Sequence, residues 1–249
     1  MQRVERIVYE RIFSGKTDIG LKRGNNEDAF IVSPEMGFCL AADGMGGAAA
    51  GELASRIFVD TTLEIFSKHT NNTEDEILLL IQKAFSFANE RILEHVAQNQ
   101  DHKGMGCTAE LLAFSADGFV LGHVGDSRTY RARNGHLEQL TEDHTLVQQQ
   151  LDEGLINPEN VRTHPLRHVI LRAIGLTHEL SLDLIQGKLA QGDLFLLCSD
   201  GLTDMVPNDQ LRDILTSDID INRKTETMID AAKTAGGNDN ITVVLAAIA

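Results

Sequence analysis

The chain has 249 residues, of which 42% are hydrophobic, 24% charged and 5% aromatic, a composition typical of a soluble globular protein with a sizeable core. Its formal net charge of -15 works against general binding to nucleic acid or to an anionic membrane and favours cationic partners such as metal ions. The first residues lack the apolar core of a signal peptide, and no run is long enough to cross a bilayer, so we expect a cytoplasmic protein.

Hydrophobic periodicity predicts both strands and helices along the chain. In chain order they are a strand over 37–43, helices over 48–69 and 74–98, strands over 107–115 and 119–126, a hairpin over 129–140, a strand over 194–200, helices over 208–216 and 225–235, and a strand over 241–249. Thr73 and Glu76 form the capping box that opens the second helix. The helices do not alternate regularly with the strands, so we expect antiparallel sheets covered by helices in one domain over 1–249.

The segment 142–175 differs from the rest of the chain in composition. It contains several histidines and arginines, and Pro158 and Pro165 interrupt it. We interpret it as an inserted lobe.

Four aspartates, Asp43, Asp126, Asp200 and Asp239, stand at the ends of predicted strands with glycines beside or near them, so that the backbone can approach a ligand closely. Any one of them, taken alone, is better explained as an ordinary turn residue. If the strands share one core, however, their ends bring these carboxylates together. Such a cluster repels itself unless a multivalent cation or protonation neutralises it.

The residue types in this cluster favour Mg²⁺ or Mn²⁺ as the cation, because both ions prefer oxygen ligands. The histidines and cysteines lack the spacing of zinc ligands. A pair of such ions can position and deprotonate a water for attack on phosphorus. The carbonyl of Gly44, directly after Asp43, can supply a further ligand.

The stretch "KRGNNEDAF" places Arg23 shortly before Glu27 and Asp28. A guanidinium near a metal-bound phosphate can hold two of its oxygens, while the two acids hold water molecules bound to the metal. A charged surface turn explains the same stretch equally well. This stretch is interpreted as part of a metal and phosphate site only because the four aspartates are also present.

The whole set of motifs closely resembles the metal-dependent serine/threonine protein phosphatases of the type 2C (PPM) family, in their compact bacterial form. It comprises, in order, "RGNNEDAF", "DGMGGAAAGELAS", "MGCTA", "GHVGDSRTYRARNG", "LTEDHTLVQQQLDEG", "HPLRHVILRAIG", "SDGL" and "GGNDNITVV". The match runs from about Asp18 to the last residues. Single motifs such as Asp-Gly are weak, but this order and spacing is highly specific.

The resemblance implies an α+β fold, an α-β-β-α sandwich of two antiparallel sheets flanked by helices. It further implies that Asp43 bridges two metal ions, Mn²⁺ or Mg²⁺, that the Gly44 carbonyl binds one of them, and that Asp200 and Asp239 bind the other. Asp126 matches the position that, with Asp200, holds a possible third ion.

Other parts of the chain take roles from the same resemblance. Arg23 matches the phosphate-binding arginine, and Glu27 and Asp28 match residues just outside the metal ligands. The segment 142–175 matches the mobile flap beside the active site. Its stretch 162–172 either contacts phosphorylated substrate or is a solvated, self-paired surface.

One departure from the family concerns the acid that protonates the leaving oxygen. Relatives have a histidine directly after the Asp-Gly pair or after the following Gly-Gly, whereas this chain has Met45 and Ala48 there. We therefore expect a metal-bound water, on the ion held by Asp126, to donate this proton.

The predicted reaction is direct hydrolysis of phosphoserine or phosphothreonine by a water that bridges the metals, with Arg23 and the ions stabilising charge on phosphorus. A pseudophosphatase that only binds phosphoproteins is a second hypothesis, and a metal-dependent nuclease is a third. The chain keeps every residue that matches a metal ligand of the family, which argues against the pseudophosphatase. Its excess of acidic over basic residues argues against the nuclease. The dispersed cysteines do not support a cysteine phosphatase, and Ser127 has no triad partners at recognisable spacing.

The predicted partners are phosphorylated proteins, including a cognate serine/threonine kinase whose action the enzyme reverses. We expect no nucleic acid or membrane partner, and a monomer.

Overall fold

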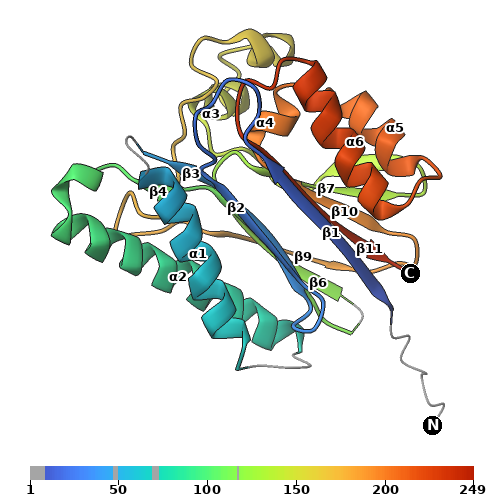
Figure 1. Ribbon diagram of the computed structural model, residues 1–249, viewed down its shortest axis with the longest axis horizontal. Helices are drawn as coiled ribbons and strands as arrows, with labels where there is room; N and C mark the ends of the chain where they lie inside the picture. Colours follow the sequence, from blue (N-terminus) through green and yellow to red (C-terminus); the bar gives the residue numbers. More distant parts are fainter. Residues whose placement is uncertain (1–8, 47–49, 69–72, 117) are drawn as a thin grey trace.

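The computed structural model describes residues 9–46, 50–68, 73–116 and 118–249, which build two antiparallel sheets packed between helices (Figure 1). The strands are β1 (Arg11–Asp18), β2 (Asp28–Ser33), β3 (Phe38–Met45), β4 (Gly106–Cys107), β5 (Ala109–Phe114), β6 (Gly118–Val124), β7 (Arg128–Arg133), β8 (His136–Gln139), β9 (Asp183–Lys188), β10 (Leu194–Cys198) and β11 (Ile241–Ile248). The α-helices are α1 (Ala50–Phe66), α2 (Glu74–Gln98), α3 (Leu146–Asp152), α4 (Asp200–Thr203), α5 (Asn208–Thr216) and α6 (Ile221–Thr234). Short 3₁₀ helices cover η1 (Gln100–His102) and η2 (Pro158–Thr163).

Each sheet joins strands that lie far apart in the sequence. The first sheet has the order β1-β11-β10-β7-β8, and the second has the order β2-β3-β5-β6-β9 with β4 paired to β3. Helices α1 and α2 cover the second sheet, and α5 and α6 cover the first (Figure 1). This is the predicted α-β-β-α sandwich.

The alternation of side chains along each strand divides the interior into three layers. In β3, Phe38, Leu40 and Ala42 pack against the helices, while Cys39 and Ala41 face the other sheet. Strands β10 and β11 alternate in the same way between α5/α6 and the space between the sheets. Because both faces of these central strands are buried, most of their residues are apolar in an unbroken run, as in Phe38–Ala42 of β3 and Val243–Ile248 of β11.

Several predicted elements differ from the observed ones. The run 107–115 is two strands, because β4 pairs with β3 and Thr108 separates it from β5. Helix α6 begins at Ile221 rather than at 225. The predicted helix 48–69 corresponds to α1, and its first two residues and its last residue lie outside the described part of the chain. Strands β1, β2 and β9 have no counterpart among the elements predicted from periodicity.

The capping box at the start of α2 is confirmed. Thr73 Oγ1 accepts a hydrogen bond from the Glu76 backbone N–H, and the Glu76 carboxylate accepts one from the Thr73 backbone N–H. The three cysteines are buried and free. Within the described ranges, no helix is both long enough and apolar enough to cross a membrane.

The segment 142–175 leaves the sandwich after β8 and carries α3 and η2 over one end of the two sheets (Figure 1). Its two ends meet at a bridge between Thr145 and Ile170. His144 fastens this root to the turn after β6, because its backbone N–H donates to the Gly125 carbonyl at 2.7 Å and its Nδ1 accepts from the Gly125 N–H at 3.1 Å. The segment is thereby anchored beside Asp126.

Candidate active site

The acidic cluster lies between the two sheets, at the end covered by segment 142–175. Asp43 has the same parity in β3 as Cys39 and Ala41, so its side chain points into the space between the sheets. Asp28 is the register partner of Asp43 in β2. Contrary to prediction, Asp43 does not end its strand, because β3 continues to Met45 and pairs there with β4.

The other three aspartates reach the same place from the other connections. Asp126 lies in the turn between β6 and β7, Asp200 is the first residue of α4 directly after β10, and Asp239 lies just before β11. With the loop that holds Arg23, they surround a cavity of about 580 Å³. The predicted site residues that line it are Arg23, Glu27, Asp43, Gly44, Asp126, Asp200 and Asp239. Asp28 lies beneath it and is buried.

The carboxylates perturb one another strongly. Burial, and then the charges of Asp28, Asp200 and Asp126, raise the pKa of Asp43 well above its usual range. Burial and the Asp126 carboxylate raise the pKa of Asp200 in the same way. Burial also raises the pKa of Asp126 to about 7, and that of Asp28 to about 6. The cluster therefore resists ionisation unless a cation enters it.

Two oxygens in this cluster indicate where a cation fits. Oδ1 of Asp28 and Oδ1 of Asp200 are buried and make no hydrogen bond within the described structure. The arginine at the rim, Arg23, donates its Nη2 to Oδ2 of Asp239 at 2.7 Å. The two guanidinium groups that line the cavity, those of Arg23 and Arg167, cannot balance so many carboxylates. A set of donors made only of oxygen fits Mg²⁺ or Mn²⁺.

The glycines beside the aspartates were expected to let the backbone approach a ligand closely. In the structure, they instead let neighbouring backbone segments approach one another. A Cβ on Gly44 would lie 2.1 Å from the Gly51 carbonyl oxygen and 2.6 Å from that of Glu27. A Cβ on Gly201 would lie 1.9 Å from the Asn240 carbonyl oxygen. These glycines bring the strands and loops of the site together.

The chain's relatives agree with this architecture. The sequence profile described as protein phosphatase 2C matches residues 22–245. The chain belongs to the protein phosphatase 2C family. The protein phosphatase PhpP of Streptococcus pneumoniae is 39% identical over 233 residues, which cover 92% of this chain and 94% of that protein.

Solved structures show the same fold as this phosphatase 2C chain. The serine/threonine phosphatase PstP/Ppp of Mycobacterium tuberculosis matches with a TM-score of 0.89 and 36% identity, over 95% of this chain and 98% of that one. A catalytic domain of PstP in complex with two manganese ions matches with a TM-score of 0.88 and 33% identity, over 97% of this chain and 99% of that one. The predicted family, fold and enzyme class, a serine/threonine protein phosphatase, are confirmed.

Sequence reasoning missed the neutral polar residues that hold the site of this phosphatase together. Asn240 is buried, and its side chain accepts from the Glu27 N–H at 2.8 Å and donates to the Ile19 and Asn25 carbonyls at 3.0 and 2.9 Å. It therefore fastens the loop that carries Arg23 to the segment that carries Asp239. The clue in the sequence was the position of Asn240 directly after Asp239.

Two further hydroxyl groups orient Asp28. Its Oδ2 accepts hydrogen bonds from Thr242 Oγ1 at 2.6 Å and from Ser199 Oγ at 2.7 Å. Ser127, considered as a nucleophile, instead shares a buried hydrogen bond of 2.7 Å with Thr108 Oγ1. This agrees with the lack of triad partners for Ser127 in the sequence.

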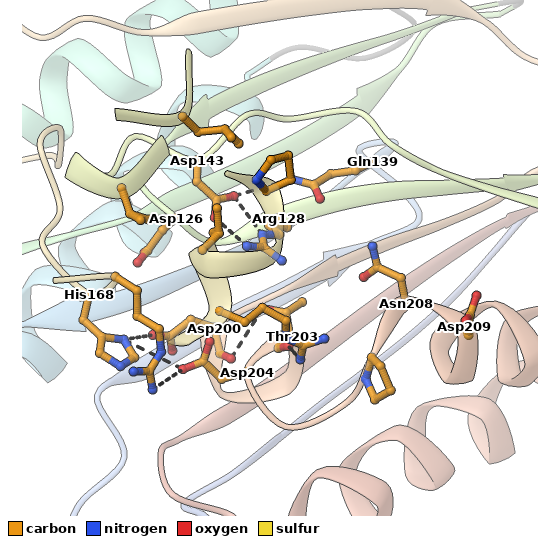
Figure 2. A pocket seen from close by; sticks show the side chains of 17 residues that line it. Asp126, Arg128, Gln139, Asp143, His168, Asp200, Thr203, Asp204, Asn208 and Asp209 are labelled. Atoms are coloured by element: carbon orange, nitrogen blue, oxygen red, sulfur yellow. Dashed lines mark hydrogen bonds and ion pairs between the residues drawn. The ribbon is translucent and has the colours of Figure 1, made fainter. Parts of the chain in front are cut away.

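Segment 142–175 brings side chains to the cavity whose positions could not be predicted from the sequence. His168 Nδ1 lies 4.0 Å from Oδ2 of Asp200 and 3.8 Å from Oδ2 of Asp204, and Arg167 Nη2 lies 3.6 Å from the same Asp204 oxygen (Figure 2). Met45 lines the cavity and has no proton to donate to a leaving oxygen. Ala48, the other position considered for that acid, lies outside the described residues.

Proposed function

We propose that this phosphatase 2C chain removes phosphate from phosphoserine and phosphothreonine in proteins by direct attack of water on phosphorus, without a covalent phosphoenzyme. The observation that carries this proposal is the buried group of aspartates at the floor of a cavity that has an arginine at its rim. The cavity offers oxygen ligands for cations and the Arg23 guanidinium for phosphate, and nothing in that lining resembles an activated serine or cysteine nucleophile.

The donor set fits two divalent ions, Mn²⁺ or Mg²⁺, as in the relative solved with two manganese ions. Asp43 would bridge them, with the Gly44 carbonyl on one and Asp200 and Asp239 on the other. Asp126 and Asp200 would hold a possible third. Bound ions supply charge neutralisation and an activated water for in-line attack.

Arg23 would bind the phosphate. Its guanidinium is half exposed and hydrogen-bonded to Asp239, which holds it at the rim of the cavity. Arginine can present two parallel N–H donors to two phosphate oxygens, and it stabilises the charge that these oxygens gain during attack.

Glu27 and Asp28 would accept hydrogen bonds from the waters around the ions. Asp28 is suited to this because Thr242 and Ser199 occupy its Oδ2 and leave its buried Oδ1 without a partner among the described groups. For the leaving oxygen, we propose that the proton comes from a water held at the Asp126 carboxylate, since Met45 cannot supply it.

The expected biological setting follows the chemistry. The substrates are phosphorylated proteins, and a cognate serine/threonine kinase supplies them. We propose that the chain works as a cytoplasmic monomer, as one domain with segment 142–175 as a flap over the site. A field of formal charge -15 leaves nucleic acid and anionic membranes as poor partners.

The test is phosphate release from a phosphothreonine peptide by the purified chain, with Mn²⁺ and then with EDTA. Asp200→Asn should lower release at least about 100-fold, as loss of a group that stabilises the transition state does. Asp230→Asn, at an exposed position of α6, is the matched control and should keep full activity. A folded chain that binds the peptide but releases no phosphate with any divalent ion would favour the pseudophosphatase hypothesis instead.

A further inference from the structure

A second cavity of about 700 Å³ adjoins the first and is lined in part by residues of α3 and η2 of segment 142–175. Figure 2 shows the side chains that line it. We call it the side pocket, and define it by Arg128, Asp143, Val147, Leu151, Arg162 and Asn208. Its wall toward the proposed catalytic cavity is shared, because the same five side chains line both cavities. They are Asp126, Arg167, His168, Asp200 and Asp204. A phosphopeptide bound at the catalytic cavity therefore has this pocket beside it.

The acidic groups of the side pocket already have partners. Asp143 receives two hydrogen bonds from Arg128, from Nε at 2.8 Å and from Nη2 at 2.6 Å. Asp209 is bound by Arg212, whose Nη1 lies 3.0 Å away. Asp126 and Asp200 belong to the proposed metal centre. These four carboxylates are thus not available to a cationic ligand.

Asp204, the remaining carboxylate, has the Arg167 guanidinium and the His168 ring beside it. Arg167 lies 3.6 Å from its Oδ2, and the His168 ring lies 3.8 Å from the same oxygen. Each carboxylate of the pocket therefore already has a neighbouring partner or a role in the proposed metal centre.

Arg162 is the cation of this pocket that lacks a carboxylate. Its Nη2 donates to the Thr203 backbone carbonyl at 3.1 Å, and no Asp or Glu of the described residues lies within 4.0 Å of its guanidinium nitrogens. A guanidinium has five N–H donors in a fixed fork that matches a carboxylate or a phosphate. Although the net charge of the chain is -15, the Arg162 guanidinium is therefore a positive group that faces the pocket without a carboxylate partner in the described structure.

The pocket also has an apolar side, made by Val147 and Leu151 of α3 and by Pro158 and Val161 of η2. An acidic side chain has methylene groups that can pack there while its charged end reaches Arg162. The volume of the pocket allows a side chain together with some of its backbone.

We propose that the side pocket binds an anionic side chain of the substrate, near in sequence to the phosphorylated residue, with Arg162 pairing with that anion. The anion is a carboxylate or a second phosphate. This inference rests on the proposed function, since it concerns the protein substrate of the same site. It makes the enzyme selective for phosphorylation sites in acidic sequences.

The test compares phosphothreonine peptides that differ at one flanking residue. Each flanking position in turn carries glutamate, glutamine or phosphoserine, and kcat/KM is measured for the unmodified chain and for Arg162→Gln. Arg223→Gln, at an exposed arginine of α6, is the matched control. An aryl phosphate, which has no flanking residue, reports on the catalytic cavity alone.

At one or more positions we expect the glutamate or phosphoserine peptide to be preferred over the glutamine peptide about fivefold to tenfold, the effect of a charged hydrogen bond in a half-open pocket. Arg162→Gln should remove this preference and leave aryl phosphate hydrolysis unchanged, and Arg223→Gln should keep both. The glutamate and phosphoserine arms distinguish the two sources of the anion.

Equal kcat/KM for the three peptides at every position, with normal aryl phosphate hydrolysis, would overturn the inference while the proposed function stands. So would a preference that survives in Arg162→Gln. No hydrolysis of any phosphate compound would overturn the proposed function and this inference together.

Discussion

Asn240 offers the sharpest test of how the site is assembled, because its buried side chain connects the segment of Asp239 with the loop of Arg23. Its three hydrogen bonds reach the Glu27 N–H and the Ile19 and Asn25 carbonyls. We expect Asn240→Ala to release this loop and to displace the Arg23 guanidinium from the rim of the cavity.

The size of the effect can be worked out from these bonds. A hydrogen bond contributes about 0.5–1.5 kcal/mol net, so three contribute at most about 4.5 kcal/mol. Residues 21–25 are exposed, so water replaces part of this loss, and we expect unfolding to become easier by about 2 kcal/mol. For a chain of this size that lowers Tm by about 4–8 °C.

The effect on catalysis is limited by what Arg23 contributes. A hydrogen bond to a charged group is worth about 1.5–3 kcal/mol, so loss of the proposed contact between Arg23 and phosphate should lower kcat/KM about 10- to 100-fold. Asn240→Ala should approach this loss with both an aryl phosphate and a phosphopeptide, at saturating Mn²⁺. Asn222→Ala, at an exposed position of α6, should change neither kcat/KM nor Tm.

A double-mutant cycle separates positioning of Arg23 from any other role of Asn240. If Asn240 acts through Arg23, the double variant with Arg23→Ala should be scarcely slower than Arg23→Ala alone. Losses that multiply in full would refute this reasoning and would indicate that Asn240 acts through its neighbour Asp239. The reasoning also fails if Asn240→Ala lowers Tm but keeps kcat/KM within about twofold.

Two further predictions concern stability. Burial lowers the pKa of His123, but its buried partner Glu110 outweighs this and raises the pKa to about 9. The folded protein therefore binds this proton more tightly than the unfolded chain does, and the resulting stabilisation, complete below about pH 6.5, is lost as the pH rises to about 9. Thermal unfolding at pH 6 and 9 should show a larger drop in Tm for the unmodified chain than for the Glu110→Gln/His123→Gln variant, and equal drops would contradict this account. Gly201→Ala should destabilise the protein by about 1–3 kcal/mol, because its Cβ would lie 1.9 Å from the Asn240 carbonyl oxygen. Gly24→Ala, which has open space around it, should keep the same midpoint of unfolding in denaturant, and a similar shift in both variants would remove the steric explanation.

The sequence predicted the parts of the fold whose pattern is local. Strand β10 is buried on both faces and is continuously apolar, strand β5 is buried on both faces and is apolar except for Glu110, and the helix α2 has both a periodic apolar face and a capping box. Strand β1 was missed because its residues are mostly half-exposed and it contains Gly15. Strand β9 has a similar pattern. Their place in the sheets depends on pairing with distant strands, which local periodicity does not encode.

For the candidate site too, some residues could be predicted from the sequence and others could not. The aspartates are conspicuous in the sequence because a carboxylate rarely follows an apolar run without a reason. Asn240, Ser199 and Thr242 are neutral and common in turns, so only the folded structure shows that they hold the carboxylates and the Arg23 loop. The position of Arg162 depends on the path of segment 142–175, which no motif specifies.

Strand β11 also has a consequence for how this enzyme comes into being. It pairs with β1 on one side and β10 on the other, and β1 has no other partner in its sheet among the described strands. While a ribosome is still synthesising the chain, β1 therefore waits for a partner made some 230 residues later, as the register of Arg11 with Ile248 shows. Asp239 and Asn240, which immediately precede β11, reach the cluster only with that strand. Given the proposed role of Asp239 as a metal ligand, we expect a nascent phosphatase of this architecture to be inactive toward phosphoproteins until β11 has left the exit tunnel.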